Sequence, residues 1–206
     1  MKIKICGITN LQDAQDAVAL GADAIGFIFT PKSPRYITPD AAEEIAIKMP
    51  PFIKLVGVFV NQSKDEITQI ATKAKIDLIQ LHGNESPEFC LTLGHQVIKA
   101  ITIADLTDIQ DIGNYLGMVS AVLLDTKIEG KEGGTGICFD WGIALRAKEE
   151  FDIPLILAGG INQDNVQKAI SLVNPYAVDV SSGVEDHPGK KDYNKMKAVI
   201  EIAQTY

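Results

Sequence analysis

The feature that most constrains this chain is an eightfold alternation of strand-like and helix-like segments joined by short connections. Apolar residues recur at helical spacing between the strand-like runs, as Ile67, Ile70, Ala71 and Ala74 do in the third such segment. Short apolar or alternating runs predict strands at 2–6, 24–29, 54–60, 77–82, 96–101, 121–126, 154–160 and 177–182. Alternation of this kind predicts parallel strands joined by right-handed crossovers.

The helices are expected between these strands and after the last one. The predicted ranges are 10–20, 38–49, 63–74, 86–93, 140–148, 162–173 and a last helix from about 192. Asn162 is expected to cap the helix at 162–173. A short or irregular helix is expected within 104–116, and a glycine-rich loop at 130–136.

Eight such units in 206 residues predict an α/β protein, a closed (β/α)8 TIM barrel that forms a single domain over residues 1–206. An open, doubly wound sheet is the alternative. That fold needs no eighth unit, and it usually carries a GxGxxG fingerprint after its first strand. Here Cys6-Gly7-Ile8-Thr9 follows the first strand, which favours the barrel.

The net charge and the cysteine pattern limit which binding partners and which cellular compartment are expected. The net charge of −8 argues against nucleic acid or an anionic membrane surface as a partner. No apolar run approaches the length of a membrane span, and the first residues do not resemble a signal peptide. The three cysteines show no paired or metal-type spacing, which predicts a reduced, cytoplasmic protein. His95 and His187 lie away from strand ends, so no histidine metal site is expected.

In a parallel barrel, functional side chains lie at the carboxyl ends of the strands. Cys6 ends the first strand, and Asp125 lies near the end of an otherwise apolar sixth strand. Arg35 follows the second strand, in a proline-containing loop. Gln80 and His82 end the fourth strand, where His82 is expected to form a hydrogen-bonding pocket wall. Each of these residues also has an ordinary structural interpretation, such as a buried small side chain for Cys6.

The ends of the seventh and eighth strands are rich in glycine and serine. In barrels, these two loops often bind phosphate through backbone N–H groups and a short helix N-terminus. A tight turn or a helix cap would use the same residues, but the two runs together favour phosphate. No lysine cluster is visible at these two strand ends. The phosphate is therefore expected to bind to the backbone N–H groups of 159–160 and 182–184, aided by a helix dipole. The predicted phosphate residues are Gly159, Gly160, Asp179, Ser181, Ser182 and Gly183.

These motifs resemble those of the phosphoribosylanthranilate isomerase family of tryptophan biosynthesis, from one end of the chain to the other. The matching stretches are KICGIT (4–9), GFIF (26–29), SPRYI (33–37), QLHG (80–83), LLDT (123–126), GGTG (133–136), FDW (139–141), LAGGI (157–161) and DVSSGVE (179–185). The resemblance implies an Amadori rearrangement of N-(5-phosphoribosyl)anthranilate that requires neither cofactor nor metal. It implies a small-molecule substrate and a monomer or homodimer.

The resemblance also implies a role for each candidate residue. Cys6 is expected to be the general base and Asp125 the general acid. Cys6 then needs its thiolate stabilised, in part by the helix that follows it, and Asp125 must hold a proton near neutrality. Arg35 is expected to pair with the anthranilate carboxylate, since a guanidinium fork suits that planar group.

Three other functions remain open at this stage. Another phosphosugar barrel enzyme, such as indole-glycerol-phosphate synthase or the aminoaldose isomerase of histidine synthesis, would resemble this chain, but Cys6 argues against both. A metal-dependent pentulose-phosphate epimerase is disfavoured by the few histidines. A barrel that has lost catalysis and serves as a scaffold is disfavoured by the presence of acid, base and phosphate loops.

Overall fold

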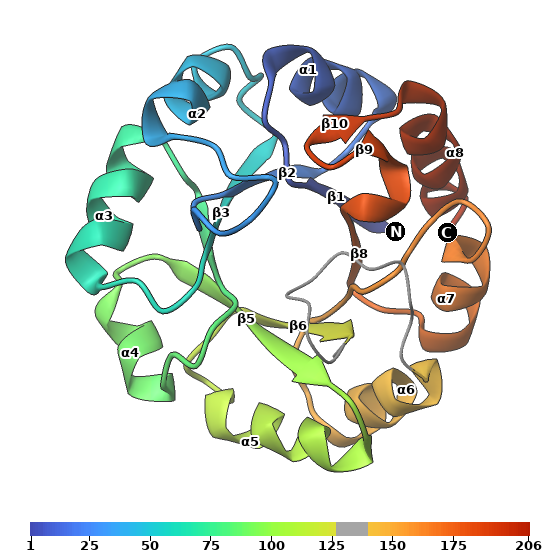
Figure 1. Ribbon diagram of the computed structural model, residues 1–206. Coiled ribbons are helices and arrows are strands. Elements are labelled where there is room, and N and C mark those ends of the chain that lie inside the picture. The colour runs from blue at the N-terminus through green and yellow to red at the C-terminus, as the bar shows by residue number, and fades with distance from the viewer. Residues whose placement is uncertain (127–139) are drawn as a thin grey trace.

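The computed structural model describes residues 1–126 and 140–206. The glycine-rich loop predicted at 130–136, and Phe139 of the FDW motif, lie outside the described residues. Eight parallel strands close into a barrel with helices around it, as Figure 1 shows in a view along the barrel axis. Each strand pairs with its neighbour in sequence, and β8 pairs with β1. The predicted fold class is confirmed.

The barrel strands are β1 (Lys2–Cys6), β2 (Ala24–Ile28), β3 (Lys54–Phe59), β4 (Leu78–Leu81), β5 (Gln96–Ile103), β6 (Ala121–Thr126), β7 (Leu155–Leu157) and β8 (Ala177–Val180). The helices are α1 (Leu11–Leu20), α2 (Pro39–Ala46), α3 (Lys64–Lys73), α4 (Pro87–Thr92), α5 (Asp111–Tyr115), α6 (Trp141–Glu150), α7 (Val166–Val173) and α8 (Tyr193–Gln204). A 3₁₀ turn, η1 (Leu106–Gln110), precedes α5, in agreement with the irregular helix predicted there. No helix in this described part of the chain has the length and apolar character of a membrane span.

The period-two alternation of each strand decides which side chains enter the barrel. In β1, Ile3 and Ile5 join the apolar layer between the barrel and its helices, whereas Lys4 and Cys6 alternate with them and face inward. The inside of the barrel holds a second, smaller apolar cluster of Val56, Ile98, Ala100, Ala121, Leu123, Ile156, Ala158 and Ala177. The inside of the barrel is therefore packed with side chains, as in a closed barrel of this size.

Capping explains most helix starts. Thr38 caps α2, with Pro39 at its first position, and Ser63 with Glu66 forms the predicted capping box of α3. The predicted cap at Asn162 is wrong, because α7 begins at Val166. Instead, Asn162 Oδ1 accepts a hydrogen bond from the N–H of Asp164, which forms a turn before the helix.

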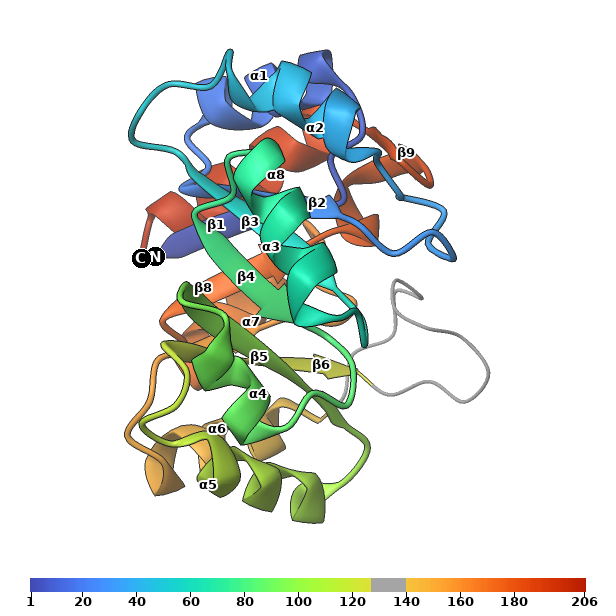
Figure 2. The same cartoon turned by 90° about the vertical axis from the view of Figure 1, so that its left-hand side faces the viewer.

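A small antiparallel hairpin, β9 (Glu185–His187) with β10 (Lys190–Lys191), lies between β8 and α8. The sequence interpretation gave this segment no element. In the side view of Figure 2, the two chain termini lie together at one end of the barrel. The hairpin lies toward the opposite end, where the arrow of β6 points. That opposite end is where the candidate residues gather.

Candidate active site

A cavity of about 400 Å³ opens at the carboxyl ends of the strands. Ten of the eleven residues predicted from the sequence line it. They are Cys6, Arg35, Gln80, His82, Asp125, Gly159, Gly160, Asp179, Ser181 and Ser182. Gly183 does not line the cavity, because its backbone packs against Ile161, whose carbonyl oxygen lies 1.9 Å from the place of a Cβ atom.

Cys6 ends β1 and is buried, with 5% of its surface exposed. The turn after it depends on Gly7, whose φ of +77° is one that other residues rarely adopt. Burial raises the pKa of the Cys6 thiol, and the nearby Lys4 and Lys191 charges oppose this only in part. The cations that act on the thiol are therefore lysines, whereas the helix expected to stabilise it begins only at Leu11.

Asp125 faces the cavity from β6, beside His82 from the end of β4. The His82 Nε2 atom lies 3.3 Å from Asp125 Oδ2, and His82 Nδ1 lies 3.4 Å from Gln80 Nε2. If Gln80 donates to Nδ1, the neutral ring presents its N–H to Asp125. The three predicted residues thus form one polar chain that runs from Gln80 through His82 to the Asp125 carboxyl group.

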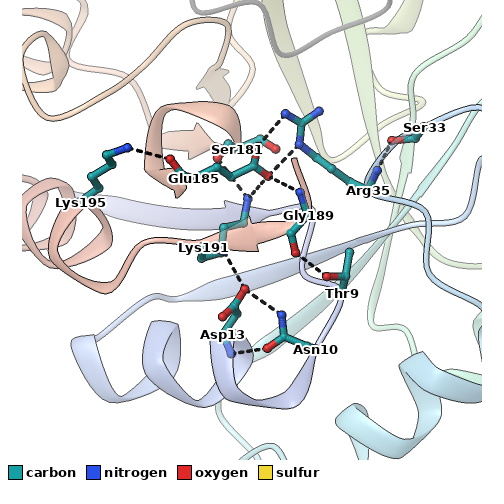
Figure 3. Close-up of polar contacts among 10 residues, drawn as sticks. All are labelled: Thr9, Asn10, Asp13, Ser33, Arg35, Ser181, Glu185, Gly189, Lys191 and Lys195. Carbon is teal, nitrogen blue, oxygen red and sulfur yellow. Dashed lines mark hydrogen bonds and ion pairs between the residues drawn. The ribbon is translucent and has the colours of Figure 1, made fainter. Parts of the chain in front are cut away.

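Arg35 lies in a buried ion pair that the sequence interpretation did not find. Its Nε and Nη2 atoms donate to the two oxygens of Glu185, at 2.8 and 2.7 Å. The Lys191 ammonium group binds the same carboxylate at 2.9 Å and the Ser181 carbonyl oxygen at 3.1 Å. Figure 3 shows Glu185 between the two cations. The fork of Arg35 is therefore already paired, and its Nη1 side faces away from Glu185.

The hairpin that carries Lys191 is held by a buried carboxylate on α1. Asp13 is 1% exposed, and its Oδ2 accepts from the backbone N–H of Lys191 at 2.7 Å and from Asn10 Nδ2 at 2.8 Å. Its Oδ1 pairs with the Lys190 ammonium group. Figure 3 draws the contacts of Asp13 with Lys191 and Asn10, which join α1 to the hairpin. Through Lys191 and Glu185 the hairpin is joined in turn to Arg35.

We expect Glu185→Gln to destabilise the protein by about 3 kcal/mol or more at pH 7, because it leaves two buried cations without their anion. Chemical denaturation measures this loss. Asp186→Asn is the matched control, since this neighbouring carboxylate is exposed and pairs only with His187 at the surface. The control is expected to change stability by less than about 0.5 kcal/mol.

The same pair predicts a dependence of stability on pH. Burial alone would raise the pKa of Glu185, but hydrogen bonds from Arg35 and the Lys191 charge outweigh it and hold that pKa below 4.5. The stabilisation is then complete above the ordinary glutamate value and is lost as pH falls through the lowered one. Denaturation between pH 6 and 3 should bring wild type and Glu185→Gln closer together. A constant gap would contradict the assignment.

The predicted phosphate loops are only partly as expected. Gly159 and Gly160 have φ values of +82° and +67°, so both need the freedom of glycine. Ser182 begins η2 (Ser182–Val184), a short 3₁₀ turn at the end of β8. The N–H of Val184 already donates to the Ser181 carbonyl oxygen at 3.4 Å, so this expected donor is in use.

Sequence reasoning missed three charged residues of this region, Lys4, Glu185 and Lys191. Lys4 could have been found, because it alternates with Cys6 on one strand. Lys191 reaches the end of β8 from a hairpin later in the chain, which no local pattern indicates. Within residues 1–126 and 140–206, no cluster of histidine, cysteine and carboxylate side chains is suited to hold a metal ion.

Comparison with known proteins agrees with this geometry. Residues 3–202 match the sequence profile of the family described as N-(5'-phosphoribosyl)anthranilate (PRA) isomerase. A curated relative from Geobacter metallireducens with that same name is 48% identical over 204 residues, which cover 99% of each chain.

Solved structures give the same result. The crystal structure of phosphoribosyl anthranilate isomerase from Thermotoga maritima superposes with a TM-score of 0.93 at 45% identity and covers 100% of both chains. A second isomerase structure, a complex with reduced 1-(o-carboxyphenylamino)-1-deoxyribulose 5-phosphate, has a TM-score of 0.90 at 43% identity with the same coverage.

Proposed function

The chain belongs to the N-(5'-phosphoribosyl)anthranilate isomerase family, and we propose that Cys6 and Asp125 are the base and the acid of its reaction. It is an isomerase of tryptophan biosynthesis. It converts N-(5-phosphoribosyl)anthranilate into the corresponding 1-deoxyribulose 5-phosphate by an Amadori rearrangement. Residues 1–206 form one domain in this proposal.

The rearrangement moves protons without any change of oxidation state overall. Asp125 gives a proton to the ring oxygen, the bond between that oxygen and the sugar C1 breaks, and an iminium ion forms. The iminium group acidifies the C2 proton, which Cys6 removes to give an enolamine. The enolamine then tautomerises to the ketone. One proton enters and one leaves, so acid and base groups are the chemistry that this fold has to supply.

The observation that carries this proposal is that Cys6 and Asp125 face one cavity from β1 and β6. Buried oxygen atoms on the walls support a sugar ligand there. Thr30 Oγ1, Gln80 Oε1 and Asp179 Oδ1 have no hydrogen-bond partner among the described residues. Ribose hydroxyl groups would donate to such atoms. A carboxylate repels phosphate, so we assign Asp179 to the sugar. The phosphate is left to Gly159, Gly160, Ser181 and Ser182, because Gly183 does not line the cavity.

Conversion of purified phosphoribosylanthranilate, without added metal, tests the activity. The ketone product should appear in the NMR spectrum in proportion to the amount of protein. An absence of ketone at any protein concentration would contradict the proposal. A metal-dependent epimerase would instead act on a pentulose phosphate and need a cation.

Arg35→Ala is expected to raise KM for the substrate about tenfold or more and to lower kcat only moderately, because it removes a carboxylate partner and leaves Cys6 and Asp125 in place. Steady-state kinetics separates the two effects. Arg146→Ala is the matched control, as Arg146 is exposed on α6 and pairs only with Glu149. An unchanged KM in Arg35→Ala would make Arg35 a purely structural partner of Glu185.

Inorganic phosphate is expected to compete with the substrate, and Gly160→Ala should weaken this inhibition about tenfold, because a methyl group strains the loop at φ +67°. Gly117→Ala carries the same kind of strain at φ +75° in open space, and Gly117 does not line the cavity, so this variant serves as control. Equal inhibition constants in the three proteins would place the phosphate elsewhere. Gly183→Val is not informative, since its side chain would meet the Ile161 backbone and disturb folding.

We also propose a cytoplasmic protein that acts on this small molecule as a monomer or homodimer. The free thiols of Cys6 and Cys90 support a reducing compartment. A solved relative from Thermotoga maritima is described as dimeric, which supports the homodimer. Sedimentation at several protein concentrations decides between the two states.

A further inference from the structure

Lys4 is a buried cation inside the barrel for which the reaction above gives no role. It is 4% exposed and faces inward from β1, two residues before Cys6. Burial of an ammonium group costs several kcal/mol unless partners surround it. Its main partner is Asp179, on the adjacent strand β8, which pairs with Lys4 in the barrel register. The Lys4 Nζ atom lies 2.7 Å from Asp179 Oδ2.

The side chain of Lys4 also lies close to Cys6, because the two residues alternate onto the same inner face of β1. The positive charge of Lys4 favours the thiolate form of Cys6. Gly26, opposite Cys6 on β2, provides the room for this contact. A Cβ atom at Gly26 would lie 2.8 Å from Cys6 Sγ and 3.1 Å from Lys4 Cε, so any side chain there would displace one of the two.

We propose that Lys4 is a positioning residue that stabilises the thiolate form of Cys6, with Asp179 holding the ammonium group against the sulfur. This inference rests on the proposed role of Cys6 as the base. Lys4 keeps its proton throughout: the thiolate takes the C2 proton of the substrate and becomes a neutral thiol, and no proton passes to or from the lysine.

The charges around Cys6 support this assignment. Lys4 on β1 and Lys191 on β10 favour the thiolate, Asp179 on β8 opposes it, and Arg35 and Asp125 line the same cavity. Lys4 is the stronger of the two lysine influences on the pKa of Cys6. Burial alone would lower the pKa of Lys4, but Asp179 and Cys6 outweigh it and raise that pKa above 10.5. Lys4 therefore keeps its positive charge beside Cys6 at neutral pH.

The test measures how fast iodoacetamide alkylates Cys6 in Lys4→Met and in wild type. The rate is measured at several pH values, by mass spectrometry of the peptide that carries Cys6. Alkylation requires the thiolate, so its rate at pH 8 should fall about tenfold for each unit by which the pKa rises. We expect a fall of about tenfold or more, with a similar fall in kcat and little change in KM. Lys2→Met, an exposed lysine on the same strand, is the control and should leave both rates unchanged.

Lys4→Met leaves Asp179 buried without its cation, and this variant can fail to fold. The comparison of Asp179→Asn with Lys4→Met/Asp179→Asn avoids that problem, because neither protein holds an unpaired carboxylate at this place. The double variant should alkylate Cys6 about tenfold more slowly at pH 8 than Asp179→Asn alone. Equal alkylation profiles would overturn the role of Lys4.

The same data separate this inference from the proposed function. Near wild-type turnover in Cys6→Ser would overturn the role of Cys6 as base. A shifted alkylation profile without a fall in kcat would overturn the positioning role of Lys4 in the reaction. The proposal is supported if Lys4→Met shows slower alkylation of Cys6 and a lower kcat while Lys2→Met shows neither change.

Discussion

In Cys6→Ser, kcat is expected to fall by about 100- to 10,000-fold, the range that a general base contributes. Serine keeps the size of the side chain, but its hydroxyl group loses a proton far less readily than a thiol does. Cys6 lines the cavity at the end of β1, and serine occupies nearly the same space there. KM should therefore change little, and the loss should lie in the chemical step. Steady-state kinetics with the native substrate measures both constants.

Cys90→Ser is the matched control for this prediction. Cys90 is also buried, at 2% exposure, but it lies on α4 and is not among the residues that line the cavity. Its replacement should leave kcat unchanged even where it lowers stability. A Cys6→Ser protein that isomerises its substrate at near wild-type rate would show that another group is the base.

The pH profile provides a second readout of the same role. Burial raises the pKa of Cys6 above 9.0, so only a small fraction is thiolate near neutral pH. A base must be deprotonated to act, and kcat/KM should therefore rise about tenfold per pH unit while the thiol is still largely protonated. This rising limb should be absent in Cys6→Ser. A flat profile from pH 6 to 9 in wild type would contradict the assignment.

The barrel could be predicted from the sequence because buried parallel strands have an easily recognised apolar pattern. Strands covered on both faces are continuous apolar runs, such as 121–124, and each is followed by a helix of the right length. The position of Cys6 and Asp125 follows from the same logic. Both lie at strand carboxyl ends, and parallel strands bring those ends together at one rim of the barrel.

The Arg35 ion pair could not be predicted in this way. Arg35 and Glu185 are 150 residues apart, and no local pattern connects them. The hairpin that carries Lys191 is short and polar, so it has neither the apolar alternation nor the length by which strands are found. The arrangement depends on Asp13, whose buried carboxylate holds the hairpin from a helix that looks ordinary in the sequence.

Lys4 is the opposite case, a residue that the sequence could have revealed. It alternates with Cys6 along β1, and period-two alternation places both side chains on the same face. A lysine on the inner face of a barrel needs a buried partner, so its presence predicts a carboxylate nearby. Asp179 on the neighbouring strand is that carboxylate. Its expected place beside the phosphate came from its position near the carboxyl end of the eighth strand, next to the serine- and glycine-rich run.

Asp125→Asn should lower kcat by about 100- to 10,000-fold, because the amide keeps the shape of the side chain but has no acid proton to give to the ring oxygen. The contact with His82, 3.3 Å from the carboxyl group in the wild type, can persist with an amide oxygen. Substrate binding should therefore change little. Steady-state kinetics with the native substrate measures kcat and KM of this variant and of wild type.

Asp152→Asn, an exposed carboxyl group between α6 and β7, is the control and should behave as wild type. A loss smaller than about tenfold in Asp125→Asn would rule out the acid role, since it lies below the contribution of a general acid. The nearest other proton source would then be His82, which joins Gln80 to Asp125. Because Cys6 acts only after the ring has opened, Cys6→Ser/Asp125→Asn should be far less impaired than the product of the two separate losses.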